Sequence, residues 1–304
     1  MPNTSPDQTP TNGAEDKAAI INRVRQTIQD LRDLPTLPTI ALEVRRLISD
    51  PKTNMAELVE VIEEDLALTG RILRIANSAY YGVPRKIDNL KMALVILGMT
   101  EISNLIMTIT VFRLFPDRPG QRSLDLTSFW RRSAICAEIT IGLFEQLKTP
   151  PPSGAYIAGL LHDLGMLLLD QHFHDLYVKC LESSESDKTT MLEAELKVIG
   201  VDHGHIGSWL TKRWNIPEEI TLAIAQHHIR PAETNPYSLS VVVSWADKLS
   251  YMLDGHSPEE AAKLLAGDQD WHNWFPVKSA STTDVVSRLQ ARLDRSLTMI
   301  QLLH

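Results

Sequence analysis

Long apolar runs and cysteine are the features that this sequence has least of. No stretch approaches the roughly 18 continuous apolar residues that a membrane-spanning helix needs, so we expect no transmembrane segment. Only two cysteines, Cys136 and Cys180, occur in 304 residues, and they lie far apart. We therefore expect two reduced thiols packed in or near a core. This pattern fits a reducing compartment and predicts a cytoplasmic protein.

Clusters of basic residues are also missing. The formal net charge is −8, whereas a nucleic-acid surface gathers Lys and Arg and an anionic membrane attracts polybasic segments. These features exclude nucleic acids and membranes as expected partners. Glycine-rich phosphate loops of the forms Gly-x-Gly-x-x-Gly and Gly-x-x-x-x-Gly-Lys are absent as well.

Helical periodicity, in contrast, is abundant. From Lys17 onward apolar residues recur at three- and four-residue steps, no segment alternates with period two for long, and no β-hairpin signal occurs. The sequence therefore predicts an all-α fold. Polar residues that can cap a helix predict several helix starts: Asn54 with Glu57, Asp65, Asp88, Ser153, and Ser257 with Glu260.

A polar connection around residues 116–126 divides the chain into two predicted lobes. Residues 1–16, rich in Pro, Thr and Asn, are expected to form a disordered leader. An N-terminal helical lobe is predicted over residues 17–115, a second helical lobe over 127–253, and a C-terminal helical cap over 254–304. The apolar stripe of the last helix is expected to cover the core: Val286, Leu289, Leu293, Leu297 and Ile300.

Residues 159–165 place the adjacent pair His162 and Asp163 in an apolar run that predicts a helix continuing toward His172. Burying this pair costs free energy unless its polar groups find partners. The pair is therefore either a structural hydrogen-bonding cluster or one half of a metal site.

Four further candidate ligands follow in the same lobe, namely His203, His227, His228 and Asp247. Imidazoles and carboxylates are ligands that Fe, Mn and Zn favour, and the six residues could form a two-metal site if four helices converge. Structural explanations are equally open. Asp202 can cap the helix that starts at His203, the His227–His228 pair ends a helix, and Asp247 can be a buried carboxylate bonded to a neighbour.

Ordered phrases across about residues 30–250 carry a resemblance to a known family. The first lobe contains Leu34-Pro35-Thr36-Leu37-Pro38 and Ala76-Asn77-Ser78-Ala79-Tyr80-Tyr81-Gly82, and the second contains Trp130-Arg131-Arg132-Ser133, His162-Asp163 and Trp214-Asn215-Ile216-Pro217 before His227-His228. In this order the chain resembles the HDOD family, the HD-related output domain of bacterial signalling, within the HD superfamily of metal-dependent phosphohydrolases. The resemblance implies a two-lobed helical bundle with an HD-like second lobe.

The chain departs from this pattern at two places. Arg132 stands where the resemblance implies a histidine that is the first metal ligand. A guanidinium has no free lone pair, so Arg132 cannot bind a cation, although it could replace one by pairing with Asp163 or Asp247. We therefore expect at most substoichiometric metal. In addition, Ile229-Arg230-Pro231 replaces the Gly-Tyr-Pro phrase of cyclic-di-GMP hydrolases, which weakens that interpretation.

Two functions follow from the resemblance. The first is a non-catalytic output or regulatory module of bacterial signal transduction that binds a signalling protein or a small-molecule or nucleotide ligand, with a candidate surface at Arg71, Arg74, Tyr80 and Tyr81. The second is a metal-dependent phosphohydrolase acting on a nucleotide or another phosphate ester, in which Arg132 or Lys248 holds the substrate phosphate. Arg132 in the place of a ligand favours the first.

Overall fold

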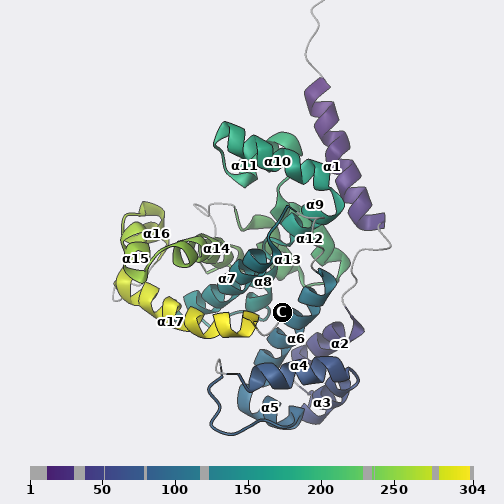
Figure 1. Ribbon diagram of the computed structural model, residues 1–304, viewed down its shortest axis with the longest axis vertical. Coiled ribbons are helices and arrows are strands. Elements are labelled where there is room, and N and C mark those ends of the chain that lie inside the picture. The colour runs from purple at the N-terminus through teal and green to yellow at the C-terminus, as the bar shows by residue number, and fades with distance from the viewer. Residues whose placement is uncertain are drawn as a thin grey trace, which may run out of the picture.

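The computed structural model describes residues 12–30, 38–50, 52–78, 81–116, 123–228, 235, 237–275 and 281–301. Every regular element in these ranges is an α-helix, which confirms the predicted all-α class. The helices form two lobes, one below the other in Figure 1, with a C-terminal group beside the upper lobe.

The first lobe occupies the lower part of Figure 1 and contains α2 (Thr39–Ser49), α3 (Met55–Glu63), α4 (Leu66–Ala76), α5 (Leu90–Leu97) and α6 (Met99–Leu114). Two predicted starts are confirmed, because Asn54 accepts from two backbone N–H groups of α3 and Asp65 accepts from one of α4. Helix α5 starts later than predicted, since Asn89 and not Asp88 caps it. Between α5 and α6 Gly98 adopts φ +85°, a conformation that favours glycine.

The second lobe is built around the long helix α7, which packs against α8, α14 and α17. Its helices are α7 (Leu126–Gln146), α8 (Ala155–Leu161), α9 (Leu164–His172), α10 (His174–Asp187), α11 (Met191–Val198), α12 (His203–Arg213), α13 (Glu218–Gln226) and α14 (Leu239–Gly255). The aromatic rings of Phe112 and Trp130 stack at 4.4 Å between centroids and join α6 to α7.

The continuous helix predicted through His162 is wrong, because α8 ends at Leu161 and α9 begins at Leu164. Asp163 leaves the helical conformation with ψ near 8°. Ser153 does not cap α8 either. The residue directly before this helix is Gly154 at φ +87°, and no side chain caps the helix. The break turns Asp163 out of the regular helix at the position where the candidate ligands meet.

Helix α1 (Asn12–Asp30) packs against α12 of the second lobe, although the predicted boundary at residue 17 assigned it to the first. Arg213 of α12 donates to the carbonyl of Ile28 at 2.8 Å. Residues 1–11 of the predicted leader lie outside the described residues, and residues 12–16 belong to α1.

The C-terminal group contains α15 (Pro258–Ala266), α16 (Gln269–Trp274) and α17 (Thr282–Gln301). The capping box of Ser257 and Glu260 is confirmed. Helix α16 was not predicted, and its Trp271 and Trp274 pack against Trp245 of α14. Val286, Leu289 and Leu293 of α17 are buried as expected, whereas the side chains of Leu297 and Ile300 lie outside the described residues.

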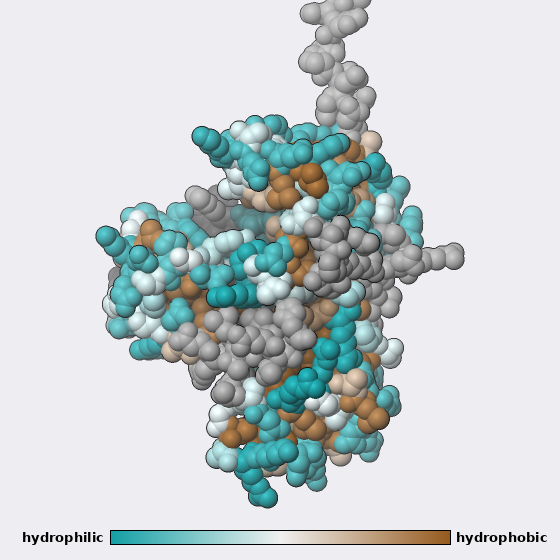
Figure 2. Space-filling model, viewed as in Figure 1, coloured by the Kyte–Doolittle hydropathy of each residue, from teal (hydrophilic) through white to brown (hydrophobic). Residues whose placement is uncertain are grey.

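Among the residues that Figure 2 colours by hydropathy, hydrophilic ones cover most of this face, and hydrophobic ones appear in separate small areas. Within the described ranges, no single helix has the length and apolar character to cross a bilayer. Helices α5 and α6 have this length and apolar character only when taken together as one span. The two helices bend by 115° at their junction.

Candidate metal centre

Close crossings of helices bring the candidate ligands together. A Cβ atom on Gly159 would lie 2.7 Å from the backbone of α7, one on Gly165 would lie 1.9 Å from the carbonyl oxygen of His203, and one on Gly204 would lie 2.8 Å from the backbone of α13. Real side chains do not tolerate such distances. These glycines therefore allow α8, α9, α12 and α13 to meet around His162 and Asp163.

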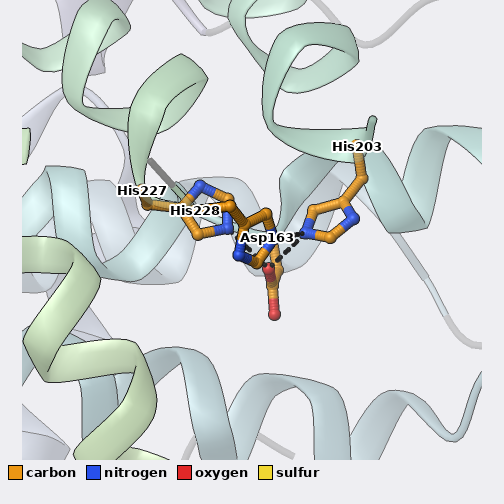
Figure 3. Close-up of side chains that lie close together, drawn as sticks. All are labelled: Asp163, His203, His227 and His228. Carbon is orange, nitrogen blue, oxygen red and sulfur yellow. Dashed lines mark hydrogen bonds and ion pairs between the residues drawn. The ribbon is translucent and has the colours of Figure 1, made fainter. Parts of the chain in front are cut away.

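Asp163 lies at the centre of the resulting cluster (Figure 3). Its Oδ1 is 3.1 Å from Nε2 of His203 and 3.4 Å from Nε2 of His227, and its Oδ2 is 3.2 Å from Nε2 of His162. The two remaining candidates complete the group. Nε2 of His162 lies 3.1 Å from Oδ1 of Asp247, and Nε2 of His228 lies 2.8 Å from Nε2 of His203.

In three histidines the outer ring nitrogen, Nδ1, which faces away from Asp163, makes a hydrogen bond that fixes the orientation of the ring. Nδ1 of His162 lies 2.8 Å from the carbonyl oxygen of Gly159, and Nδ1 of His227 lies 2.7 Å from that of Ile224. Nδ1 of His203 lies 2.7 Å from Oε2 of Glu195. Carbonyl and carboxylate oxygens only accept, so each Nδ1 carries its proton. In the neutral imidazoles, each Nε2 lone pair then points toward the Asp163 carboxylate.

Lone pairs and carboxylate oxygens are both acceptors, so this arrangement requires a cation between them. The cation can be a proton on an imidazole or a metal ion. Outer-nitrogen hydrogen bonds of this type are the ones that orient histidine ligands of metals, and the imidazole and carboxylate set suits Fe, Mn or Zn. His227 supports metal binding directly, because its Nε2 is buried, makes no hydrogen bond among the described residues, and is therefore available as a ligand. The residues therefore fit a divalent metal.

Protons can meet the same requirement. Burial opposes a charge on His162 and His203, but the carboxylates of Asp163 and Glu195 outweigh it and raise the pKa of both imidazoles well above the usual value. For His228, burial and the charges on His227 and His203 lower the pKa to about 3. A neutral His228 can thus accept a hydrogen bond from a protonated His203. Metal and protons would compete for this centre.

The six candidates divide unequally between two cation positions. Asp163, His203, His227 and His228 offer four ligand atoms that lie within 4.8 Å of one another. The second group contains only His162, His227 and Asp247, and it shares His227 with the first. The first group has the four ligands of a four-coordinate metal such as Zn²⁺. The second has only two ligands that it does not share, His162 and Asp247, with Oδ2 of Asp163 lying 3.2 Å from Nε2 of His162.

Arg132 lies on α7 and faces α14 at Tyr251, one turn after Asp247. Helices α7 and α14 run antiparallel, so that Arg131 pairs with Asp254 at 2.8 Å and the Arg132 guanidinium lies 5.3 Å from the ring centre of Tyr251. One turn along α7, burial raises the pKa of the Cys136 thiol, whereas the charge of His162 lowers it. The ion pair that we expected from Arg132 to Asp163 or Asp247 is not formed among the described residues, since its guanidinium lies over the Tyr251 ring instead.

Glu195 is a site residue that the candidate set omitted. It is fully buried, and its Oε2 accepts from both Nδ1 and the backbone N–H of His203. In the sequence, the sign of this role was an acidic residue eight positions before His203. Asp202, in contrast, accepts from the backbone N–H of His205 and caps α12, which confirms its structural explanation.

The structure exposes only some of the residues of the candidate surface on the first lobe. Arg74 is exposed and lines a groove of about 740 Å³ together with Lys86. Tyr81 donates to Oε1 of Glu101 at 2.7 Å, and Arg71 is partly buried. Tyr80 lies outside the described residues. The groove and the His/Asp cluster therefore lie in different lobes.

Fold and site together define an all-α protein with a buried His/Asp cluster in its second lobe that could hold a metal ion. The family model of the HDOD domain matches residues 34–230, and the chain therefore belongs to the HDOD family. Among curated proteins it is similar to an uncharacterized protein of Treponema pallidum, with 26% identity over 230 residues that cover 75% of this chain and 44% of the relative. It is also similar to the uncharacterized protein YuxH of Bacillus subtilis, with 25% identity covering 41% of this chain and 30% of the relative. The chain thus spans less than half the length of these relatives.

Solved structures share the fold. An HDOD domain protein with unknown function from Geobacter sulfurreducens is 26% identical, with a TM-score of 0.75 over 93% of this chain and 96% of that one. A candidate phosphohydrolase from Shewanella amazonensis gives the same TM-score at 23% identity, over 92% of this chain and 98% of that one. The second likeness shows the fold alone.

Replacing Arg132 by histidine should strengthen metal binding. The new imidazole would supply the ligand that the His162–Asp247 position lacks and would remove a positive charge. We expect Mn²⁺ affinity to rise by about tenfold or more, since even residues that only orient ligands change affinity by about 10–100-fold. Arg131→His is the matched control, because Arg131 pairs with Asp254 instead. Equal Mn²⁺ binding by the two variants, measured by isothermal titration calorimetry, would mean that position 132 does not reach the centre.

Proposed function

We propose that this chain is a non-catalytic output or regulatory module of bacterial signal transduction, which acts by binding a small ligand or a signalling protein. The chain's HDOD membership supports this function at the level of the family. A likeness in fold to a candidate signal transduction protein from Marinobacter aquaeolei is compatible with it.

One observation carries the non-catalytic part of the proposal. Two-metal hydrolysis needs two cation positions roughly 3.5–4 Å apart, so that one metal supplies the hydroxide and the other binds the phosphate. Here the second group contains His162, Asp247 and a His227 that it shares with the first. Only Oδ2 of Asp163, which lies 3.2 Å from Nε2 of His162, can add to it. On α7, Arg132 stands where the family resemblance implies a metal-binding histidine. The centre is therefore suited to one metal or to protons, which stabilise the second lobe.

A metal-dependent phosphohydrolase is the alternative. The complete group of Asp163, His203, His227 and His228 favours it, and a candidate metal-dependent phosphohydrolase from Shewanella amazonensis has a related fold. With metal bound, Asp163 would hold the ion together with these imidazoles, and the ion would supply an activated water.

A hydrolysis assay separates the two functions. The wild-type protein and Asp163→Asn are each incubated with Mn²⁺, Fe²⁺ or Zn²⁺ and with phosphomonoesters, phosphodiesters and nucleotides. We expect the wild type to form no more hydrolysis product than Asp163→Asn with any metal, whether free phosphate from a monoester or nucleotide or the monoester and alcohol from a diester. Turnover that requires both a metal and Asp163 would replace the proposal by the alternative.

A further inference from the structure

The groove of about 740 Å³ on the first lobe combines apolar and cationic side chains. One wall is the C-terminal part of α4, with Leu73 and Arg74, and the other is the segment before α5, with Val83 and Lys86. Leu73 and Val83 are half-buried, whereas Arg74 and Lys86 are exposed. A ligand in the groove would therefore meet apolar surface and two positive charges.

Asn77 holds the two walls of this groove together. Its Nδ2 donates to the carbonyl oxygens of Leu73 and Ile87, both at 2.7 Å, and its Oδ1 accepts from the backbone N–H of Ile87 at 2.8 Å. Ile87 is 1% exposed and anchors the segment before α5 in the core. The groove is thus formed in the free chain, and a ligand does not have to order it.

The charge around the groove is opposite to that of the whole chain. Residues 70–91 contain five basic residues and one acidic residue, although the chain has a formal net charge of −8. Neither Arg74 nor Lys86 forms an ion pair with another of the described residues. The acidic residue, Asp88, accepts from the side chain of Asn89 at 2.6 Å. The two cations are therefore available to an anionic partner.

The apolar part of the groove narrows the class of partner. Among the described residues no aromatic side chain lines the groove, so a nucleotide base would find no ring on which to stack. A peptide can present carboxylates and apolar side chains along the same segment, and clusters of basic residues recognise acidic motifs of this kind.

We propose that this groove binds an acidic, partly apolar peptide segment of a signalling protein. The inference rests on the proposed function and names the surface and the chemistry of the partner. The carboxylates of the segment pair with Arg74 and Lys86, and its apolar side chains contact Leu73 and Val83. The His/Asp cluster in the other lobe takes no part in this binding.

Fluorescence anisotropy with labelled synthetic peptides tests the groove in the full chain. The probe alternates glutamate with leucine, and its two counterparts alternate lysine with leucine and glutamate with serine. We expect the wild type to bind the glutamate–leucine peptide, to bind the glutamate–serine peptide more weakly, and not to bind the lysine–leucine peptide. Raising NaCl from about 0.1 M to about 1 M should weaken binding, because salt screens exposed charges.

Charge reversal in the groove provides the variants. A chain with both Arg74→Glu and Lys86→Glu should bind the glutamate–leucine peptide at least about tenfold more weakly. It should also gain affinity for the lysine–leucine peptide, a result that a misfolded lobe would not give. Lys179→Glu is the matched control, because Lys179 is an exposed lysine on α10 of the other lobe.

The outcomes distinguish the groove from the function. Failure of the wild type to bind the glutamate–leucine peptide at millimolar concentrations, or equal binding by the double variant and Lys179→Glu, overturns the proposal. Binding to phosphatidylglycerol vesicles that the double variant loses, without binding of the peptide, would assign the groove to a lipid surface and overturn it too. Turnover in the hydrolysis assay would refute the non-catalytic function while the groove remained, whereas no peptide binding and no turnover would refute the groove alone.

Discussion

Replacing Gly165 by alanine is expected to lower the free energy of unfolding by about 3 kcal/mol or more. The new Cβ would lie 1.9 Å from the carbonyl oxygen of His203 and 2.9 Å from the backbone nitrogen of Gly207. Both contacts are with backbone atoms, so no side chain can turn aside, and α9 would have to move away from α12. Because His203 begins α12, this movement would also separate Asp163 from His203.

Gly70→Ala is the matched control for this prediction. Gly70 lies inside α4, and a Cβ there would meet nothing within 4 Å. Alanine should therefore stabilise the protein by about 0.5–1 kcal/mol, because it is the better helix former. Urea denaturation of both variants checks the pair. Equal stability of Gly165→Ala and the wild type would show that α9 and α12 are not held at this distance.

Replacing Asp163 by alanine should cost about 3–5 kcal/mol, because it removes one partner from a buried set of charges. Asp163 is 5% exposed and faces three imidazoles. Without it, the charges on His162 and His203 would be left buried, or both rings would have to lose a proton. We expect a clear fall in the melting temperature at neutral pH.

An exposed aspartate provides the comparison. Asp175 lies in the first turn of α10, and Asp175→Ala should cost under about 1 kcal/mol because it removes only a favourable charge at a helix N-terminus. Similar melting temperatures for the two variants would contradict a charged cluster centred on Asp163.

The sequence predicted the fold well because helical signals are local. Asn54, Asp65 and the pair Ser257–Glu260 form the predicted caps. The errors arose where tertiary contacts decide. The apolar run through His162 favours one helix, but the close approach of Gly165 to His203 accompanies a break. Helix α1 has an ordinary amphipathic pattern, which does not reveal that it packs on α12.

The candidate site could be predicted as a set of residues but not as a geometry. The order of His162-Asp163, His203, His227-His228 and Asp247 selected side chains that the structure brings together. Their inward direction depends on the outer hydrogen bonds of Nδ1, two of which reach main-chain carbonyls that no side-chain pattern specifies. The position of Arg132 over the Tyr251 ring depends on how α7 aligns with α14, which the sequence pattern does not specify.

The metal content of the purified protein tests the central claim most directly, namely that this centre does not hold the two metals of a phosphohydrolase. The protein is purified anaerobically, and Fe, Mn and Zn are measured per chain by elemental analysis. The account predicts at most one metal ion per chain, with protons on His162 and His203 where no metal is bound. Two metal ions per chain would contradict it, since the His162–Asp247 position would then bind metal beside Arg132.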